Sequence, residues 1–222
     1  MSAKERTLKL PDGSTVSALW QKPKGAKAVL VLAHGAGAGM THRHMAATAD
    51  GLEARGIATL RYNFPYMEKG SKRPDSPPVA HAAIRVAVGD AAKLAGDLPL
   101  FAGGRSFGAR MTSQAQALEP LPSVTGLVFF AFPLHAPGKP GIERAEHLSS
   151  VKIPMLFLQG TKDEFADLDL LKPVTAKLGK RAKLHLAEHA DHSFHAPAKS
   201  GRKDPEVLAE ILDAAHDWML KQ

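Results

Sequence analysis

The pentapeptide Gly104–Gly108, Gly-Arg-Ser-Phe-Gly, constrains the fold of this chain more than any other segment. A short apolar run, Leu98–Ala102, precedes it, and Ala109–Ala115 has the pattern of the first turns of a helix. G-x-S-x-G between a strand and a helix is typical of a sharp turn that raises the serine hydroxyl above the edge of a sheet. A side chain at either glycine would collide with a neighbouring element. The context therefore predicts that Ser106 is a nucleophile.

Strand and helix patterns alternate along most of the chain. After a predicted hairpin of Thr7–Leu10 and Thr15–Leu19, six segments are predicted as strands: Ala28–Ala33, Ile57–Tyr62, Leu98–Gly103, Gly126–Phe130, Pro154–Leu158 and Ala182–Leu186. Helices are predicted after the serine turn and at Met45–Arg55, Val79–Leu94, Leu168–Leu178 and Pro205–Leu220. The last helix is expected to bury Leu208, Ile211, Leu212, Ala215 and Met219. Repeated β–α units predict an α/β fold with a mostly parallel sheet, helices on both faces, and one domain over residues 1–222.

Two longer connections limit what can cover the site. Lys69–Pro78 is rich in proline, lysine and serine and is predicted to be a loop. Ala131–Ile153 is the place where a cap could be inserted, but it has room for at most one short helix. The sequence therefore predicts no large lid and a rather open pocket.

Composition narrows the classes of function. The formal charge of +7 comes from scattered basic residues, and aromatic residues make up 6% of the chain, which leaves little for base stacking, so we expect no nucleic-acid partner. No apolar stretch approaches the roughly 20 residues that span a bilayer, so no membrane association is expected. The absence of cysteine excludes disulfides, thiolate metal sites and a cysteine nucleophile. The charged start, Met1–Arg6, lacks a following apolar segment, and a cytoplasmic location is expected.

A serine nucleophile needs a general base, and the base needs an acid that orients it. In this architecture the acid follows the serine in the chain and the histidine comes last. Asp163 is the predicted acid, because it lies in the turn after the strand Pro154–Leu158. Glu164 competes with it, whereas Asp167 and Asp169 fit the start of the next helix, where a carboxylate accepts free N–H groups.

The predicted base is His192, in the loop that follows the strand Ala182–Leu186. His189 and His195 are its rivals. His192 lies centrally in this loop, and Phe194 can anchor the loop by burial. Chain order and loop position favour His192 over the reading in which all three are exposed loop histidines.

The remaining element is an oxyanion hole. Its expected donors are the backbone N–H of Phe107 and an N–H from the loop after Ala28–Ala33, with Ala36 first and Gly37 second. A phosphate-binding reading of this glycine-rich loop is disfavoured, because neither a dinucleotide nor a P-loop pattern continues from it. Three nearby histidines, His34, His42 and His44, suggest a metal site, but the loop lacks a carboxylate and a recognisable ligand spacing. We therefore expect no metal and no cofactor.

Six segments in series resemble one family: His34–Gly37, Arg61–Tyr66, Gly103–Arg110, Phe132–Pro140, Gln159–Asp163 and Asp191–Phe194. Together they look like the compact α/β-hydrolases that include testis-expressed and NSL-complex subunit 3-like proteins, with dienelactone hydrolases as more distant relatives. The resemblance implies an eight-stranded α/β-hydrolase fold without a large lid, and a triad of Ser106, Asp163 and His192. Dienelactone hydrolases proper use a cysteine nucleophile, which this chain lacks, and some eukaryotic relatives belong to chromatin complexes.

These features predict a serine hydrolase that cleaves a small-molecule ester or thioester through an acyl-enzyme. The alternatives are a binding or scaffold protein with little turnover and, third, a peptidase. Substrate-binding residues are predicted by position, from loops at the carboxyl ends of strands: Gly37, Asn63, Phe64, Arg105 and Phe132, with Tyr66 and His135 as further candidates. For Arg105 an ion pair with a nearby carboxylate is the competing expectation. The oligomeric state is left open.

Overall fold

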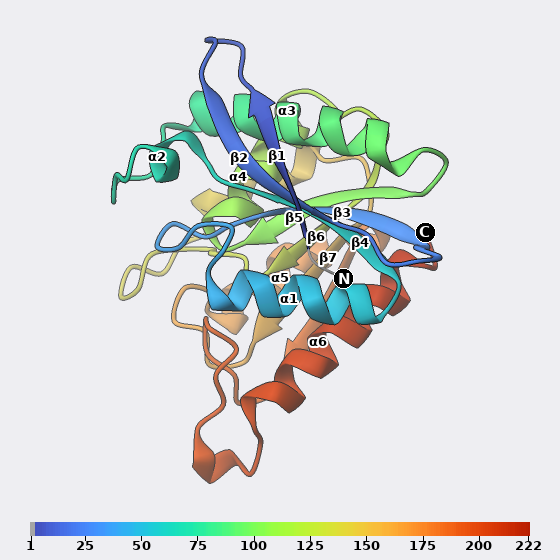
Figure 1. The fold of residues 1–222 in the computed structure, drawn as a ribbon. Helices are drawn as coiled ribbons and strands as arrows, with labels where there is room; N and C mark the ends of the chain where they lie inside the picture. Colours follow the sequence, from blue (N-terminus) through green and yellow to red (C-terminus); the bar gives the residue numbers. More distant parts are fainter. Residues whose placement is uncertain (1–2) are drawn as a thin grey trace.

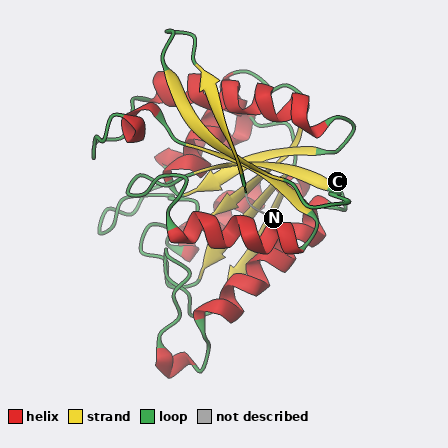
Figure 2. Ribbon diagram, in the orientation of Figure 1, coloured by secondary structure: helices red, strands yellow, loops and turns green. Residues whose placement is uncertain are grey.

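The computed structural model describes residues 3–222; Met1 and Ser2, from the charged start of the chain, lie outside the described residues. Within that range, eight strands form one sheet in the order β1-β2-β4-β3-β5-β6-β7-β8 (Figures 1 and 2). The strands are β1 (Lys4–Lys9), β2 (Thr15–Gln21), β3 (Ala28–Ala33), β4 (Ile57–Tyr62), β5 (Leu100–Arg105), β6 (Val124–Phe130), β7 (Met155–Gly160) and β8 (Ala182–Ala187). Strands β3 to β8 run parallel, whereas β1 and β2 are antiparallel to their neighbours. The predicted α/β-hydrolase architecture is confirmed.

Helices cover both faces of the sheet, as Figure 1 shows for α3 above it and α1 with α6 below it. The helices are α1 (Arg43–Ala54), α2 (Pro65–Glu68), α3 (Pro77–Ala95), α4 (Phe107–Leu118), α5 (Leu168–Lys177) and α6 (Asp204–Met219), with short 3₁₀ helices η1 (Glu143–Ser150), η2 (Gly179–Arg181) and η3 (Ala198–Ser200). Two cores result, one under α1 and α6 and the other under α3, α4 and α5. All parallel strands therefore end at one edge, where the loops carry the candidate site residues.

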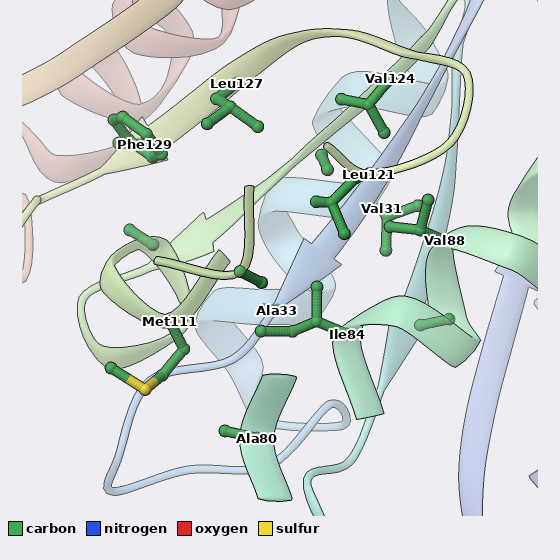
Figure 3. Packing of buried hydrophobic residues seen from close by; sticks show 14 of the residues in the cluster. Val31, Ala33, Ala80, Ile84, Val88, Met111, Leu121, Val124, Leu127 and Phe129 are labelled. Carbon is green, nitrogen blue, oxygen red and sulfur yellow. The ribbon is translucent and has the colours of Figure 1, made fainter. Parts of the chain in front are cut away.

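Alternating small and branched side chains let α3 lie close to the sheet. Figure 3 shows Ile84 and Val88 of this helix beside Ala33 and Val31 of β3, and Ala80 belongs to the same buried cluster. All five side chains are 2% exposed or less. This packing buries one face of α3 against β3, whose end borders the serine turn.

Element boundaries differ from the sequence expectation in two informative places. Strand β5 begins at Leu100, two residues later than predicted, because Leu98 N–H still bonds to Ala95 O in the turn after α3. The predicted loop Lys69–Pro78 ends earlier, since α3 begins at Pro77. Proline is favoured at the first helical position because its missing N–H has no partner there in any helix.

The predicted buried face of the last helix is confirmed at Ile211, Leu212, Ala215 and Met219 and differs at one position. Leu208 is half-buried rather than buried, while Val207 and Trp218 lie in the core beside Ile211 and Leu212. Leu208 packs against the edge of this core, so the buried face is wider than expected and includes Val207 and Trp218.

The connection from β6 to β7 contains η1 and otherwise irregular backbone, so the structure has no large lid, as predicted. Among residues 3–222 we find no helix with the length and apolar character needed to traverse a bilayer.

Glycines bring the β5–α4 turn against the end of β3. A Cβ atom at Gly104 would lie 2.4 Å from the carbonyl oxygen of Ala33, and one at Gly108 would lie 2.6 Å from the same oxygen and 2.7 Å from that of His34. Such contacts are far inside van der Waals separation, and backbone atoms cannot move aside easily. The expected steric need for glycine at both ends of the motif is confirmed.

This packing predicts opposite effects for one substitution at two helical glycines. Gly108→Ala should lower the free energy of unfolding by about 1–3 kcal/mol, because the added methyl group overpacks the end of β3. Gly89→Ala, in α3, should raise it by about 0.5–1 kcal/mol, since nothing lies within 4 Å of the added Cβ and alanine favours helix. Urea denaturation of both variants beside the wild type measures this, and equal midpoints for the two variants would contradict it.

Candidate active site

Ser106 occupies the sharp turn between β5 and α4. Its backbone has φ 50° and ψ −112°, a conformation that non-glycine residues rarely adopt and that costs roughly 1–3 kcal/mol. Two hydrogen bonds hold it: Ser106 N–H donates to Phe130 O of β6 at 3.0 Å, and Arg110 N–H donates to Ser106 O at 3.1 Å. The turn thus fixes the hydroxyl at the carboxyl edge of the sheet.

The three side chains predicted as a triad form one hydrogen-bonded line. His192 Nε2 lies 2.8 Å from Ser106 Oγ. On the other side of the ring, Nδ1 lies 2.9 Å from Oδ1 and 2.8 Å from Oδ2 of Asp163. Because a carboxylate only accepts, Nδ1 carries the proton and Nε2 is left to accept from the serine hydroxyl. This is the arrangement that nucleophilic catalysis by serine requires.

Two hydrogen bonds besides the one from His192 hold the carboxylate of Asp163 in place. Its side chain is fully buried. Phe165 N–H donates to Oδ1 at 2.8 Å, and the Gln159 side-chain amide donates to Oδ2. Of its rivals, Asp167 caps α5 by accepting from Asp169 N–H, as expected, and Glu164 is exposed.

The His192 loop is ordered by its own turn. Asp191 Oδ1 accepts from Ser193 N–H at 2.7 Å and from His195 N–H at 2.9 Å. The buried Phe194 anchors the loop. The ring centres of Phe165 and His192 lie 4.3 Å apart. Of the two rival histidines, His195 pairs with Asp204 at 3.0 Å on the surface. The other, His189, follows β8 with its N–H on Thr161 Oγ1.

Arg105 joins the serine turn to the histidine loop. Its guanidinium donates from Nη2 to His192 O at 2.8 Å and lies 5.5 Å from the Phe194 ring centre. Burial lowers the pKa of Arg105, with attraction from Asp163 and Asp191 opposing the shift. Within residues 3–222 no carboxylate lies within ion-pair distance of it, so the expected ion pair is absent and a backbone contact takes its place.

The loop after β3 faces Ser106 with Ala36. Ala36 and Phe107 line one cavity with Ser106, and in the described part of the chain neither of their N–H groups donates a hydrogen bond. Phe107 is the first residue of α4, so its N–H has no acceptor within the helix. The Tyr66 hydroxyl donates towards Ala36 O at 2.9 Å and Gly35 O at 3.2 Å, which orients the peptide groups of the loop. Sequence reasoning had Tyr66 only as a possible pocket wall.

His34 ties the same loop to the sheet. Its Nε2 accepts from Phe64 N–H at 3.0 Å and its Nδ1 lies 2.7 Å from Gly35 O, so the ring is neutral and fully buried. Burial lowers the pKa of His34 to about 4. His42 lies at the start of α1 with its ring accepting from His44 N–H. In the described residues no group of three or more histidine, aspartate or glutamate side chains is arranged to hold a metal ion.

The cavity over Ser106 has a volume of about 350 Å³. It is lined by Ala36, Pro74, Asp75, Ser106, Phe107, Arg110, Pro133, Arg144 and Phe165. Sequence reasoning missed Arg144, Asp75 and the role of Arg110 in this lining. Arg110 could have been found, because it follows the nucleophile by one helical turn; Arg144 and Asp75 lie on irregular connections whose path no pattern predicts.

Most of the predicted substrate-binding residues lie elsewhere. Phe64 and Phe132 are fully buried, Phe64 against the rings of His34 and Phe107 and Phe132 against other aromatic rings. Asn63 accepts from Met40 N–H and donates to a glutamate, so it braces the loop after β3. Gly37 is exposed on that loop, outside the lining of the cavity. A residue that follows the carboxyl end of a strand lies near the site, but successive side chains point in opposite directions, so some of them enter the core instead.

Comparison with known proteins places this geometry in a family. Residues 26–220 match a family model described as an alpha/beta hydrolase domain. The chain belongs to the α/β-hydrolase family. Among solved structures, a lidless α/β serine hydrolase from Xanthomonas campestris shares 20% identity at a TM-score of 0.76, covering 98% of this chain and 95% of its own.

Two further solved structures share the fold. A dienelactone hydrolase from Anabaena variabilis shares 18% identity at a TM-score of 0.77, with 100% of this chain and 99% of that one covered. Est1E from Butyrivibrio proteoclasticus, solved with ferulic acid bound, shares 19% identity at a TM-score of 0.76, with 98% of each chain covered. At identities of 20% or less, these similarities show the fold of the chain and not its activity.

Burial of neutral His34 predicts a pH-dependent stability. Its pKa of about 4 in the folded chain lies below the ordinary 6.5, so between these values the unfolded chain binds more protons. Neutral His34 contributes up to about 3 kcal/mol to the free energy of unfolding. This contribution is complete above the unfolded pKa of 6.5 and is lost as the pH falls towards the folded pKa of about 4.

His34→Gln tests this, because glutamine can still accept from Phe64 N–H without titrating. Urea denaturation at about pH 7 and about pH 4.5 should give a smaller loss of stability for the variant than for the wild type. Equal losses in both proteins would show that His34 does not contribute.

Proposed function

We propose that this protein is a serine hydrolase that cleaves a small ester or thioester through an acyl-enzyme intermediate. The observation that carries the proposal is the hydrogen-bonded line from Ser106 Oγ through both nitrogens of His192 to Asp163. Membership of the α/β-hydrolase family supports it, as does the fold shared with a lidless serine hydrolase and a dienelactone hydrolase. One catalytic domain over the whole chain and a cytoplasmic location belong to the same proposal.

The first half-reaction forms the acyl-enzyme. Ser106 Oγ attacks the acyl carbon while His192 Nε2 takes its proton, and Asp163 holds the imidazole in the tautomer that accepts it. Negative charge develops on the carbonyl oxygen, and the N–H groups of Ala36 and Phe107 donate to it. His192 then protonates the leaving oxygen or sulfur as the tetrahedral intermediate collapses.

The second half-reaction returns the enzyme to its starting state. His192 removes a proton from water, whose oxygen attacks the acyl carbon, and the same N–H groups stabilise the second tetrahedral intermediate. Collapse releases the acid and reprotonates Ser106. The open cavity admits water and product without a lid having to move.

Replacement of the nucleophile separates this proposal from a non-catalytic scaffold, which the resemblance to chromatin-complex proteins would favour. Ser106→Ala should abolish hydrolysis of 4-nitrophenyl esters and acyl-CoA thioesters and remove labelling by a fluorophosphonate probe, while the urea midpoint changes little. The measurements are initial rates and probe labelling of both folded proteins. Wild-type turnover in the alanine variant, or an unlabelled wild type, would refute the assignment.

Asp163→Asn should lower kcat/KM for the same esters by roughly 1,000- to 10,000-fold, because an asparagine amide can donate and so stabilises the wrong imidazole tautomer. Glu164→Gln is the matched control: it removes one charge from the neighbouring, exposed position. Its kcat/KM should stay within about twofold of the wild type. Equal losses in both variants would argue that the loop's charge, rather than the contact to His192, supports activity.

A further inference from the structure

Two arginines enter the cavity that contains Ser106. Arg110 lies on the first turn of α4, four residues after Ser106, and Arg144 lies on η1 in the β6–β7 connection. Among residues 3–222, no carboxylate oxygen comes within 4.0 Å of either guanidinium. Both side chains are half-buried, and a guanidinium that loses part of its hydration without a partner costs free energy.

The hydrogen bonds of the two side chains leave most of their donors free. Arg144 donates from Nη1 to His135 O at 3.0 Å. The Nε of Arg110 is buried and has no hydrogen-bond partner in the described residues. Each guanidinium has five N–H groups in a planar fork that matches a carboxylate. Both side chains line the cavity and have N–H donors that no hydrogen bond among the described residues uses.

The other ionisable groups at this place do not balance the two charges. Asp75 lines the same cavity and accepts from Tyr66 N–H at 3.0 Å, but it supplies one negative charge against two guanidinium groups and forms an ion pair with neither. Behind Arg110, His147 bonds to Ser113 Oγ at 2.8 Å, and burial, then the charge of Arg110, lowers the pKa of His147 to about 4, so it is neutral. Burial and repulsion from Arg144 also lower the pKa of Arg110.

The rest of the lining is small or apolar. Pro74, Phe107, Pro133 and Phe165 supply walls without charge, within a volume of about 350 Å³. A cavity of this size and lining fits a short carbon chain between the reacting acyl group and an anion. It does not fit a long acyl chain, which would need an extended apolar channel.

We propose that the substrate of this site carries a carboxylate, which Arg110 and Arg144 bind while Ser106 attacks the ester or thioester carbonyl. This inference rests on the proposed function and names its substrate class. The two guanidinium groups supply both charge and bidentate geometry to the anion, and the anion relieves their mutual repulsion. The substrate is thus a half-ester of a short dicarboxylic acid or an ester whose leaving group bears the carboxylate.

Paired esters that differ only in charge test the proposal on the full-length protein. For an anion in the acyl part, 4-nitrophenyl succinate is compared with 4-nitrophenyl levulinate, in which a methyl ketone replaces the carboxylate. For an anion in the leaving group, 4-acetoxybenzoate is compared with 4-acetoxybenzamide. In one of the two pairs, the wild-type kcat/KM should favour the anionic ester by roughly 10- to 100-fold, mainly through KM.

Charge-removing variants then assign the preference to these residues. Arg110→Gln and Arg144→Gln should each reduce the anionic-to-neutral ratio of kcat/KM by roughly tenfold or more. Lys172→Gln, which removes the same charge from an exposed position on α5, is the matched control and should keep the wild-type ratio. Competitive inhibition of wild-type levulinate hydrolysis by succinate, but not by succinamide, gives a second readout that needs no variant.

Three results would overturn the inference. A wild-type ratio near one in both pairs together with no inhibition by succinate would do so, as would an unchanged ratio in both arginine variants. A wild type that hydrolyses none of the four esters and takes no fluorophosphonate label would overturn the proposed function itself, and this inference with it. If the wild type hydrolyses the neutral esters but shows no preference for the anionic ones, the proposed hydrolase function is retained and the proposed carboxylate site is wrong.

Discussion

The close approach of the β5–α4 turn to the end of β3 is the contact on which the site depends. Gly104 and Gly108 let this turn lie on the backbone of Ala33 and His34, where any side chain would clash. The same contact sets Ser106 beside the loop that begins at His34, so the proposed nucleophile and the proposed oxyanion donors, Ala36 and Phe107, share one support. The strained backbone of Ser106 is tolerated because packing and hydrogen bonds on both sides leave it no alternative.

The elements that sequence reasoning located are those with a local signal. The strand–turn–helix context located Ser106, and chain order located Asp163 and His192, because the carboxyl ends of parallel strands meet at one edge. Boundaries shifted where tertiary contacts decide them. Strand β5 runs on to Arg105 because pairing with β6 continues to the turn, which hydrophobicity alone does not reveal.

The pocket walls could not be predicted, since they depend on which side of a strand end each side chain takes and on the path of irregular loops. Asn63, Phe64 and Phe132 leave strand ends at the correct edge, yet they brace or fill the protein beneath the site. Arg105 was expected near the substrate or a carboxylate and instead binds a carbonyl of the histidine loop. This contact depends on how the turn after β5 and the loop after β8 lie relative to each other, which a single sequence does not reveal.

The β6–β7 connection is built differently from the rest of the candidate site. The triad stands on turns fixed by the sheet, whereas Arg144 stands on η1, which contributes to no strand pairing. Replacing this connection would therefore change Arg144 and its surroundings, whereas the turns that hold Ser106, Asp163 and His192 and the helix that holds Arg110 would keep their support.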